Sequence, residues 1–399
     1  SDKARIPGLV KDWLAGQGSR DPLLLVSEYG EQAELGAYDV RSYGERSRAF
    51  LKVQEGCDHR CSFCIVPQAR GPSRSLPMDA VLEQAPYPVK ALLIMGTNPL
   101  LTSSDPLKGE EALKALDFSV AIDLFMNPTT QLADIVLPAA SWLEQDDVAD
   151  LHFIWCVAAR QKVAEIGECW DDKKILIELA KRLGLEDSFP WKDVREWCDY
   201  VLEDTGLDFE AFKEEGMLKG EMRYRKHETQ GFPTASGKFE IACSALESMG
   251  FDPIPDYVEP PESPYSTPEL AGEYPLVAIT GAKIEPFFHT ELRQVASLRK
   301  RNPDPLVELN PETAERLSIE EGDWVWIESP RGRIRQRAML SPGIDFRVIS
   351  IQHAWWFPER EPPEYGWKES SASLLLDHRP ADAVWGSEPW KGFLCNIYK

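Results

Sequence analysis

Three cysteines near the amino terminus have a spacing that suits an iron–sulfur cluster. Cys57, Cys61 and Cys64 form the pattern C-x3-C-x2-C. Three thiolates in one tight loop can hold three irons of a cubane cluster and leave the fourth iron open to a substrate. Structural or zinc-binding cysteines are the alternative, but zinc takes four ligands, and no fourth ligand fits the motif although His59 lies within the loop. The spacing therefore predicts a [4Fe–4S] cluster.

The segment around these cysteines resembles a known family. RAFLKVQEGCDHRCSFCIVPQARGPSRS is similar to the radical S-adenosylmethionine methylthiotransferases that modify tRNA, of the threonylcarbamoyladenosine type, and the resemblance covers residues 1 to about 85. It implies that the three cysteines bind the cluster that cleaves S-adenosylmethionine. Most of that family's barrel, its RNA-binding domain and its amino-terminal domain have no counterpart in this sequence. We therefore expect residues 1–87 to be an incomplete radical enzyme fragment without methylthiotransferase activity.

A second group of polar residues follows an apolar strand predicted over residues 92–95. Gly96, Thr97, Asn98 and Pro99 stand at its carboxyl end, which is the edge where open α/β sheets bind ligands. Taken alone, these residues are typical of an ordinary turn. Further on, apolar strands alternate with helical segments as far as residue 140, a pattern that predicts a parallel sheet with crossover helices. We assign residues 88–251 to a Rossmann-like α/β domain.

The remaining chain reads as a linker and a barrel. Residues 252–273 are rich in proline and have too few apolar residues for a strand or helix of their own, so we interpret them as a linker. Strands predominate over residues 274–399, with one helix predicted to begin at the cap Asn310 before Pro311. This segment predicts a compact β-barrel.

Residues 92–399 resemble, in the same order, the carboxyl-terminal half of the molybdopterin oxidoreductases of the dimethyl sulfoxide reductase family. The similarity runs through IMGTNPLL, FSVAIDLFMNPTTQLADIVLPAASWLEQDDV and GECWDDKKILIELAKRLGL to the barrel segment, and is greatest to the acetylene hydratase-like and thiosulfate reductase-like branch. It implies a Rossmann-like domain followed by a double-psi β-barrel, which together embrace a bis(molybdopterin guanine dinucleotide) cofactor carrying molybdenum or tungsten. An iron–sulfur electron-transfer subunit is the partner that it implies.

The resemblance suggests cofactor-binding residues in the α/β domain. Asn98 can pair its amide with a phosphate or a pterin edge, and Asp123 can accept hydrogen bonds from guanine. Thr129 and Thr130 are predicted to begin a helix whose amides favour phosphate. Asp134 is more typical of a structural cap than of a ligand.

In the barrel, Thr280 and Gly281 end a strand before a loop that leads to His289. The resemblance implies a pterin contact for His289, although a histidine beside two phenylalanines is also typical of a half-buried structural residue. Trp356 and its neighbour Trp355 are candidates to wall the cofactor, although buried aromatic residues at a strand end are usually core.

Two departures from the family weaken the expected site. Ser371, Ser373 and Leu376 stand where the family usually has two asparagines and a threonine that bind pterin. The part of the family that supplies the metal ligand would precede residue 88, and no residue of this chain matches it, so no catalytic residue is predicted.

Composition narrows the function classes. The net charge is −22, and residues after 87 hold 33 Lys and Arg against 54 Asp and Glu, which makes nucleic acid an unlikely partner. No run of eighteen apolar residues predicts a membrane span, and the cysteine usage favours a reducing, cytoplasmic setting. A first residue other than methionine suggests an amino-terminal truncation.

Three hypotheses follow. The leading one is the cofactor-binding part of a molybdenum or tungsten oxidoreductase, whose chemistry requires further domains. The alternative is a radical methylthiotransferase that uses a cluster and S-adenosylmethionine on tRNA. The third is an inactive product of gene fusion.

Overall fold

The chain is described here by a computed structural model with two compact units. The structure describes residues 54–55, 74–75, 82, 89–151, 154–254, 256–282, 285–287, 289–378, 388 and 390–399. The larger unit comprises Lys90–Met222, Glu259–Ala381 and Glu388–Lys399, and the smaller comprises Ser1–Val89, Arg223–Val258 and Asp382–Ser387. The elements described in the smaller unit are short: β1 (Gln54–Glu55), β2 (Arg74–Ser75), α9 (His227–Gln230) and α10 (Ser244–Ser248).

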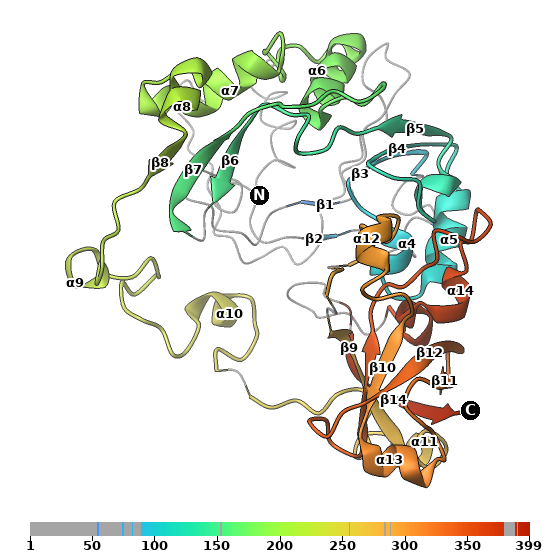
Figure 1. Ribbon diagram of the computed structural model, residues 1–399. Coiled ribbons are helices and arrows are strands. Elements are labelled where there is room, and N and C mark those ends of the chain that lie inside the picture. The colour runs from blue at the N-terminus through green and yellow to red at the C-terminus, as the bar shows by residue number, and fades with distance from the viewer. Residues whose placement is uncertain are drawn as a thin grey trace, which may run out of the picture. The chain divides into compact units, whose positions relative to one another are not determined.

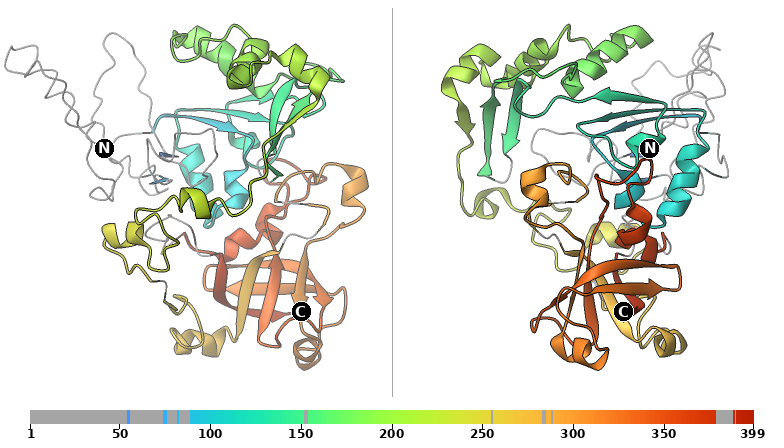
Figure 2. Two further views of the ribbon diagram at one scale, coloured as in Figure 1. Left: turned by 90° about the vertical axis from the view of Figure 1, so that its left-hand side faces the viewer. Right: turned by 45° about the vertical axis from the view of Figure 1, so that its right-hand side comes forward.

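A three-stranded parallel sheet opens the larger unit, as the alternating pattern predicts. Its strands are β3 (Ala91–Met95), β4 (Phe118–Asp123) and β5 (Ile135–Pro138), hydrogen-bonded in that order. Two helices, α4 (Pro99–Thr102) and α5 (Pro106–Lys114), connect β3 to β4. Both lie on the same side of the sheet in Figures 1 and 2. The helix expected from Thr129 is only the single 3-10 turn η2 (Thr130–Leu132).

In the sequence, the fourfold spacing of Ile175, Leu179 and Leu183 predicts a helix over residues 171–185. The structure confirms it as helix α6 (Asp172–Leu183). The Asp171 side chain caps it by accepting from the Lys173 amide at 2.8 Å, and Gly184 ends it in the left-handed region at φ +68°, where glycine carries no Cβ penalty. Ile175 of α6 packs on Ile122 and Leu137 of the sheet. The helix therefore covers one end of one sheet face.

An antiparallel sheet that the sequence analysis did not predict follows the parallel one. It consists of β6 (Asp147–Leu151), β7 (Cys156–Arg160) and β8 (Met217–Lys219). Helices α7 (Val194–Leu202) and α8 (Phe209–Glu215), with the turn η4 (Glu203–Thr205) between them, pack on it through buried Cys198, Leu202, Phe209 and Phe212. Burial raises the pKa of the Cys198 thiol to about 12, so this cysteine is a core residue rather than a reactive one.

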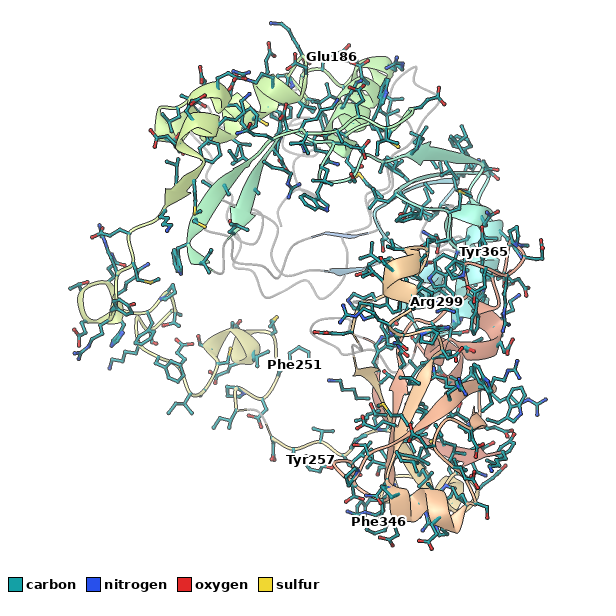
Figure 3. All side chains as sticks on the ribbon, in the orientation of Figure 1. Glu186, Phe251, Tyr257, Arg299, Phe346 and Tyr365 are labelled. Atoms are coloured by element: carbon teal, nitrogen blue, oxygen red, sulfur yellow. The ribbon has the colours of Figure 1, made fainter. Side chains whose placement is uncertain are left out.

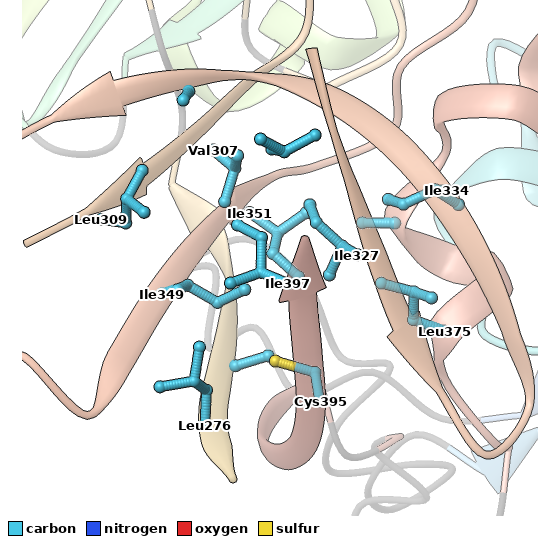
Figure 4. Close-up of a cluster of buried hydrophobic side chains, with 14 of the residues drawn as sticks. Leu276, Val307, Leu309, Ile327, Ile334, Ile349, Ile351, Leu375, Cys395 and Ile397 are labelled. Carbon is cyan, nitrogen blue, oxygen red and sulfur yellow. The ribbon is translucent and has the colours of Figure 1, made fainter. Parts of the chain in front are cut away.

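The carboxyl-terminal part of the larger unit is a closed six-stranded barrel, which confirms the predicted barrel. Its strands are β9 (Leu276–Ala282), β10 (Leu306–Leu309), β11 (Trp324–Ser329), β12 (Gly332–Leu340), β13 (Val348–Gln352) and β14 (Lys391–Tyr398), in the closed order β10-β12-β11-β14-β9-β13. Inward-facing side chains such as Val307, Ile327, Ile351 and Ile397 fill its interior (Figure 4). Alternation of buried and half-buried residues along β11 and β12 reflects the period of two in a strand.

Short helices surround the barrel. They are α11 (Pro268–Glu273), α12 (Ala296–Arg299), α13 (Pro311–Arg316), α14 (Trp367–Ser370) and the turn η5 (Ala372–Leu375). Asn310 caps α13 as predicted, because its side chain accepts from the Glu312 amide at 2.9 Å. Helix α11 lies within the segment expected to be a linker without structure of its own. Among the described residues, no helix is long and apolar enough to cross a membrane.

The barrel and the parallel sheet share a second core. Leu100 and Leu101 of α4 pack against Trp356, Trp367 and the Tyr365 ring. The Gln131 amide donates to the Tyr365 hydroxyl at 2.8 Å, and Figure 3 labels Tyr365 beside α5. Since these contacts lie within one compact unit, the strand ends of the sheet and of the barrel are held close together.

Candidate functional site

A cavity of about 870 Å³ lies where the strand ends of the sheet and the barrel meet. We call it the strand-end cavity. The residues discussed below line it from the sheet side, namely Gly96, Asn98, Asp123, Asn127 and Asp172, and from the barrel side, namely Thr280, His289, His353, Trp356 and Trp390. The carboxyl ends of parallel strands are the usual ligand edge of α/β sheets, and the volume lies toward the upper end of the range of small-molecule and cofactor pockets.

Asn98 is buried at the end of β3 and has a fixed orientation. The Thr129 hydroxyl donates to Asn98 Oδ1 at 2.6 Å and accepts from the Leu100 amide at 3.2 Å. The other carboxamide atom, Nδ2, is buried and has no hydrogen-bond partner within the described part of the chain. A buried amide left without a partner costs free energy, so Asn98 presents a donor that a ligand acceptor would satisfy.

Asp123 ends β4 and faces the same cavity. Asn127 Nδ2 donates to Asp123 Oδ2 at 3.0 Å, and the Phe125 amide donates to Oδ1 at 3.4 Å. Burial raises the pKa of Asp123 above its ordinary value, although these hydrogen bonds and one from the Leu124 amide favour the ionised form. The carboxylate is therefore desolvated and is a strong acceptor for a ligand N–H.

Asp172 is a second acid in the cavity wall, which the sequence analysis missed. Its Oδ1 is buried, and no described residue donates a hydrogen bond to it. Burial, the neighbouring Asp171 and then Asp123 raise its pKa, against the opposing effect of Lys173. The signal in the sequence is the pair of acids at 171 and 172. The Asp171 side chain caps α6, so the Asp172 carboxylate is not needed for the cap.

On the barrel side, two histidines meet. His353 Nε2 lies 3.2 Å from His289 Nδ1, and the two rings are perpendicular. Arg293 holds both backbones, because it donates to the His289 carbonyl at 2.5 Å and to the His353 carbonyl at 3.5 Å. Burial lowers the pKa of Arg293 to about 9, which still leaves the guanidinium charged near neutral pH. His353 follows β13, and the sequence analysis did not select it.

The remaining candidates in the barrel differ in whether they line the cavity. Thr280 lines the cavity and donates its hydroxyl to the Trp390 carbonyl at 2.5 Å. Trp356 lines it too, and its indole N–H donates to the Thr290 carbonyl at 2.8 Å. Trp355 is not part of the cavity wall, and a cofactor contact of Gly281 stays a prediction. Trp355 instead packs with Phe287 and Phe357 in a buried cluster, as expected of a core residue.

The structure corrects the role expected for Thr129. Only the 3-10 turn η2 begins there, not an α-helix, and the amides of Thr129 and Thr130 both donate to Asn127 Oδ1, at 2.9 and 3.0 Å. Because both amides are already paired and both residues are buried, they do not form a phosphate site. Thr129 acts through Asn98 instead.

Asp134, Ser371, Ser373 and Leu376 have structural roles. Asp134 accepts from the Ser119 amide at 2.7 Å, which agrees with a structural role. Ser371 and Ser373 are buried and their hydroxyls bond each other at 2.7 Å, while Leu376 belongs to the barrel core; none of the three lines the cavity. Cys57, Cys61 and Cys64 lie outside the described residues, so the cluster on them stays a prediction.

A parallel sheet and a six-stranded barrel whose strand ends share one cavity form the arrangement of a protein that binds a ligand between two domains. Two family models match the chain: "Molybdopterin oxidoreductase" over residues 71–182 and "Molydopterin dinucleotide binding domain" over residues 276–393. The two matched segments are therefore similar to two domains of the molybdopterin oxidoreductases. The first match begins within the segment that the sequence analysis assigned to the radical enzyme fragment.

Relatives with known names agree with this assignment. Acetylene hydratase of Syntrophotalea acetylenica is 35% identical over 320 residues, which are 78% of this chain and 43% of the relative. Dopamine dehydroxylase of Eggerthella lenta is 31% identical, over 80% of this chain and 39% of the relative. The solved structure of acetylene hydratase from Pelobacter acetylenicus superposes with a TM-score of 0.75 at 34% identity, over 81% of this chain and 46% of that one. The chain thus spans less than half the length of these relatives.

Proposed function

We propose that the strand-end cavity binds the guanine dinucleotide part of a bis(molybdopterin guanine dinucleotide) cofactor that carries molybdenum or tungsten. The chain would then be the cofactor-binding part of an oxidoreductase. When bound, the metal supplies redox or hydration chemistry at its own coordination sphere. The residues of this chain bind and orient the cofactor.

One observation carries the proposal. The cavity wall contains a buried donor without a partner, Asn98 Nδ2, and a buried acceptor without a partner, Asp172 Oδ1, within the described residues. Polar atoms of this kind are rarely left unpaired in a protein interior. A ligand with both acceptor and donor edges fits them, and purines and pterins have such edges.

The chemistry of the wall favours guanine over adenine. A carboxylate accepts from the adjacent N1–H and N2–H groups of guanine, whereas adenine presents an acceptor at N1. Asp123 and Asp172 both offer carboxylate oxygens to the cavity. On this proposal they hold the base, Asn98 donates to a phosphate or pterin edge, and Thr280, His289 and Trp356 contact the pterin side.

Titration with free nucleotides tests the proposal. We expect GDP to bind the full chain about tenfold more tightly than ADP, because the mismatched base leaves buried carboxylates unpaired. The Asp123→Asn and Asp172→Asn variants should each remove this preference. Equal affinities for the two nucleotides, or no binding of either by calorimetry, would contradict the proposal.

Two of the six strand pairings in the barrel are parallel, β10 with β12 and β9 with β13, which supports a double-psi topology.

The names of two relatives, "Thiosulfate reductase molybdopterin-containing subunit PhsA" and "F420-dependent formate dehydrogenase subunit alpha", describe subunits. We infer that this chain likewise works with an electron-transfer subunit, of the iron–sulfur kind.

A further inference from the structure

Three side chains that can bind a metal ion meet away from the strand-end cavity. They are Asp105, Asp377 and His378, and their ligand atoms all lie within 4.8 Å of one another. Asp105 stands between α4 and α5, whereas the other two residues follow the turn η5, which α5 contacts. Asp105 and His378 are 273 residues apart in the sequence. We call these three residues the aspartate–histidine cluster.

One ring nitrogen of His378 faces both carboxylates. Its Nδ1 lies 3.1 Å from Asp105 Oδ2 and 3.3 Å from Asp377 Oδ1. A charge-assisted hydrogen bond from nitrogen to a carboxylate is usually about 2.7–2.9 Å long, and one N–H does not point straight at two acceptors. The observed distances fit two ligands of one zinc ion better, because bonds of about 2.0–2.2 Å place neighbouring ligand atoms roughly 3–3.5 Å apart.

The two oxygens of Asp105 have separate roles. Oδ1 accepts from the Lys108 amide at 3.4 Å, as the cap of α5, and Oδ2 is the atom beside His378. The His378 side chain is only 13% exposed, whereas that of Asp377 is 49% exposed. The cluster therefore has an inner side that the protein holds in place and an outer side open to water. Such a site suits a metal that keeps a water among its ligands.

A buried hydroxyl without a partner stands next to the cluster in the chain. Ser104 is completely buried, and its Oγ has no hydrogen-bond partner among the residues that the structure describes. Buried hydroxyls are rarely left unpaired, and a metal-bound water would supply the partner. The Ser104 amide donates to Glu388 Oε2 at 2.7 Å, which brings a further carboxylate to the same turn. The acidic side chains gathered here attract a cation.

We propose that Asp105, Asp377 and His378 bind a zinc ion, which joins the turn after α4 to the segment after η5. One imidazole nitrogen with two carboxylate oxygens is a ligand set that zinc accepts, whereas magnesium prefers oxygen ligands. The role of the ion is structural, because the unfolded chain does not hold these ligands together and zinc therefore stabilises the folded state. None of the three residues lines the strand-end cavity, so zinc binding here is independent of the proposed cofactor.

Calorimetric titration with zinc tests the proposal. The background is the full chain with serine at its three clustered cysteines, because those thiols would bind zinc by themselves; the changes are Cys57→Ser, Cys61→Ser and Cys64→Ser. We expect this chain to bind one zinc ion. Magnesium at the same concentration should not displace it. No zinc binding, or full displacement by magnesium, would overturn the proposal.

Substitution of the two acids locates the bound ion. Asp105→Asn and Asp377→Asn should each weaken zinc binding about tenfold or more, because each replaces an anionic ligand with a neutral amide. Asp345→Asn is the matched control, since the side chain of this acid is similarly exposed (42%) and lies outside the cluster. It should bind zinc as the background chain does. Equal affinities in all three variants would place the ion elsewhere and contradict the proposal.

His378→Arg separates a metal site from an ordinary ion pair. Arginine keeps a positive charge beside the two carboxylates but has no lone pair for a metal. We expect it to weaken zinc binding about a hundredfold, and zinc to raise the urea midpoint of the background chain but not that of His378→Arg. Unchanged zinc affinity in His378→Arg would mean that the cluster is an ion pair only. If His378→Arg does not fold, Asp377→Asn at its half-exposed position takes its place in the urea comparison.

Discussion

At the scale of single residues, the Thr129 hydroxyl decides what Asn98 offers to the cavity. It donates to Asn98 Oδ1 and accepts from the Leu100 amide, and all three groups are buried. We predict that Thr129→Val lowers the free energy of unfolding by about 1–3 kcal/mol, because it leaves buried polar groups unpaired. The same change should weaken GDP binding, since the Asn98 carboxamide becomes free to turn. Urea unfolding and calorimetry measure the two effects.

Thr129→Ser is the control for that prediction. It keeps the hydroxyl and loses one methyl group, so its GDP affinity should remain close to that of the wild type. If valine and serine at position 129 gave the same affinity, the hydroxyl would have no role in orienting Asn98.

The raised pKa of Asp123 predicts opposite pH dependences for stability and binding. Burial favours the protonated form in the folded state, so the folded chain binds more protons than the unfolded chain above pH 3.8. Stability should therefore fall as the pH rises from that value through the raised pKa. GDP affinity should rise over the same window, because guanine donors need the ionised carboxylate. Both trends are measured between about pH 4 and 7.

Asp123→Asn is the decisive variant for this pH dependence. It cannot ionise, so the part of the stability loss that comes from Asp123 should disappear, while Asp172, whose pKa burial also raises, keeps its own contribution. A GDP affinity that is flat with pH in the wild-type chain would contradict the assignment of Asp123 to the base.

The sequence could predict those site residues that stand at or directly after the carboxyl end of an apolar strand. Asn98 and Asp123 come directly after or at the end of apolar strands, and the structure brings them to one cavity with Thr280, His289 and Trp356. Asp172 could not be chosen, because its neighbour is equally acidic and only the cap geometry separates the two. Thr129 was selected, but as a helix start, because the sequence does not show that its hydroxyl donates to Asn98.

At the scale of elements, the two positive-φ glycines Gly96 and Gly366 differ in the space around the position that a Cβ atom would take. Gly96 ends β3 at φ +57° with open space where a Cβ would stand, whereas Gly366 begins α14 at φ +63° with Arg360 Cδ 2.6 Å and Phe357 Cδ2 3.0 Å from that position. We predict that Gly96→Ala costs about 1 kcal/mol from backbone strain alone. Gly366→Ala should cost clearly more in the same urea experiment, because a steric clash adds to the strain. Equal costs would contradict this.

Elements with strong local signals were predicted well, and those without them were not. The capped helix α6 and the apolar strands β3 to β5 follow directly from caps and runs of apolar residues. The sheet of β6, β7 and β8 was missed because Asp147 and Asp150 interrupt β6, and because β8 joins from some sixty residues away. Pairing at that separation is set by the core of Cys198 and Phe212, which no local pattern encodes.

At the scale of the larger unit, the core between α4 and the barrel couples the two halves of the site. Leu101 is completely buried there against residues such as Trp356 and Trp367. Truncating a buried leucine leaves a cavity that costs about 2–5 kcal/mol. We predict that Leu101→Ala lowers the stability of the parallel sheet and of the barrel together, since both contribute to this core.

Hydrogen exchange measured in urea resolves this last prediction by residue. Amides of β4 and of β13 should lose the same protection in Leu101→Ala, because they belong to one cooperative unit joined through α4. Leu101→Met conserves the side-chain volume and should cost less than about 1.5 kcal/mol at both places. If only the sheet amides lost protection, the barrel would be stable without α4, and the strand-end cavity would lie between two independently folding parts rather than within one.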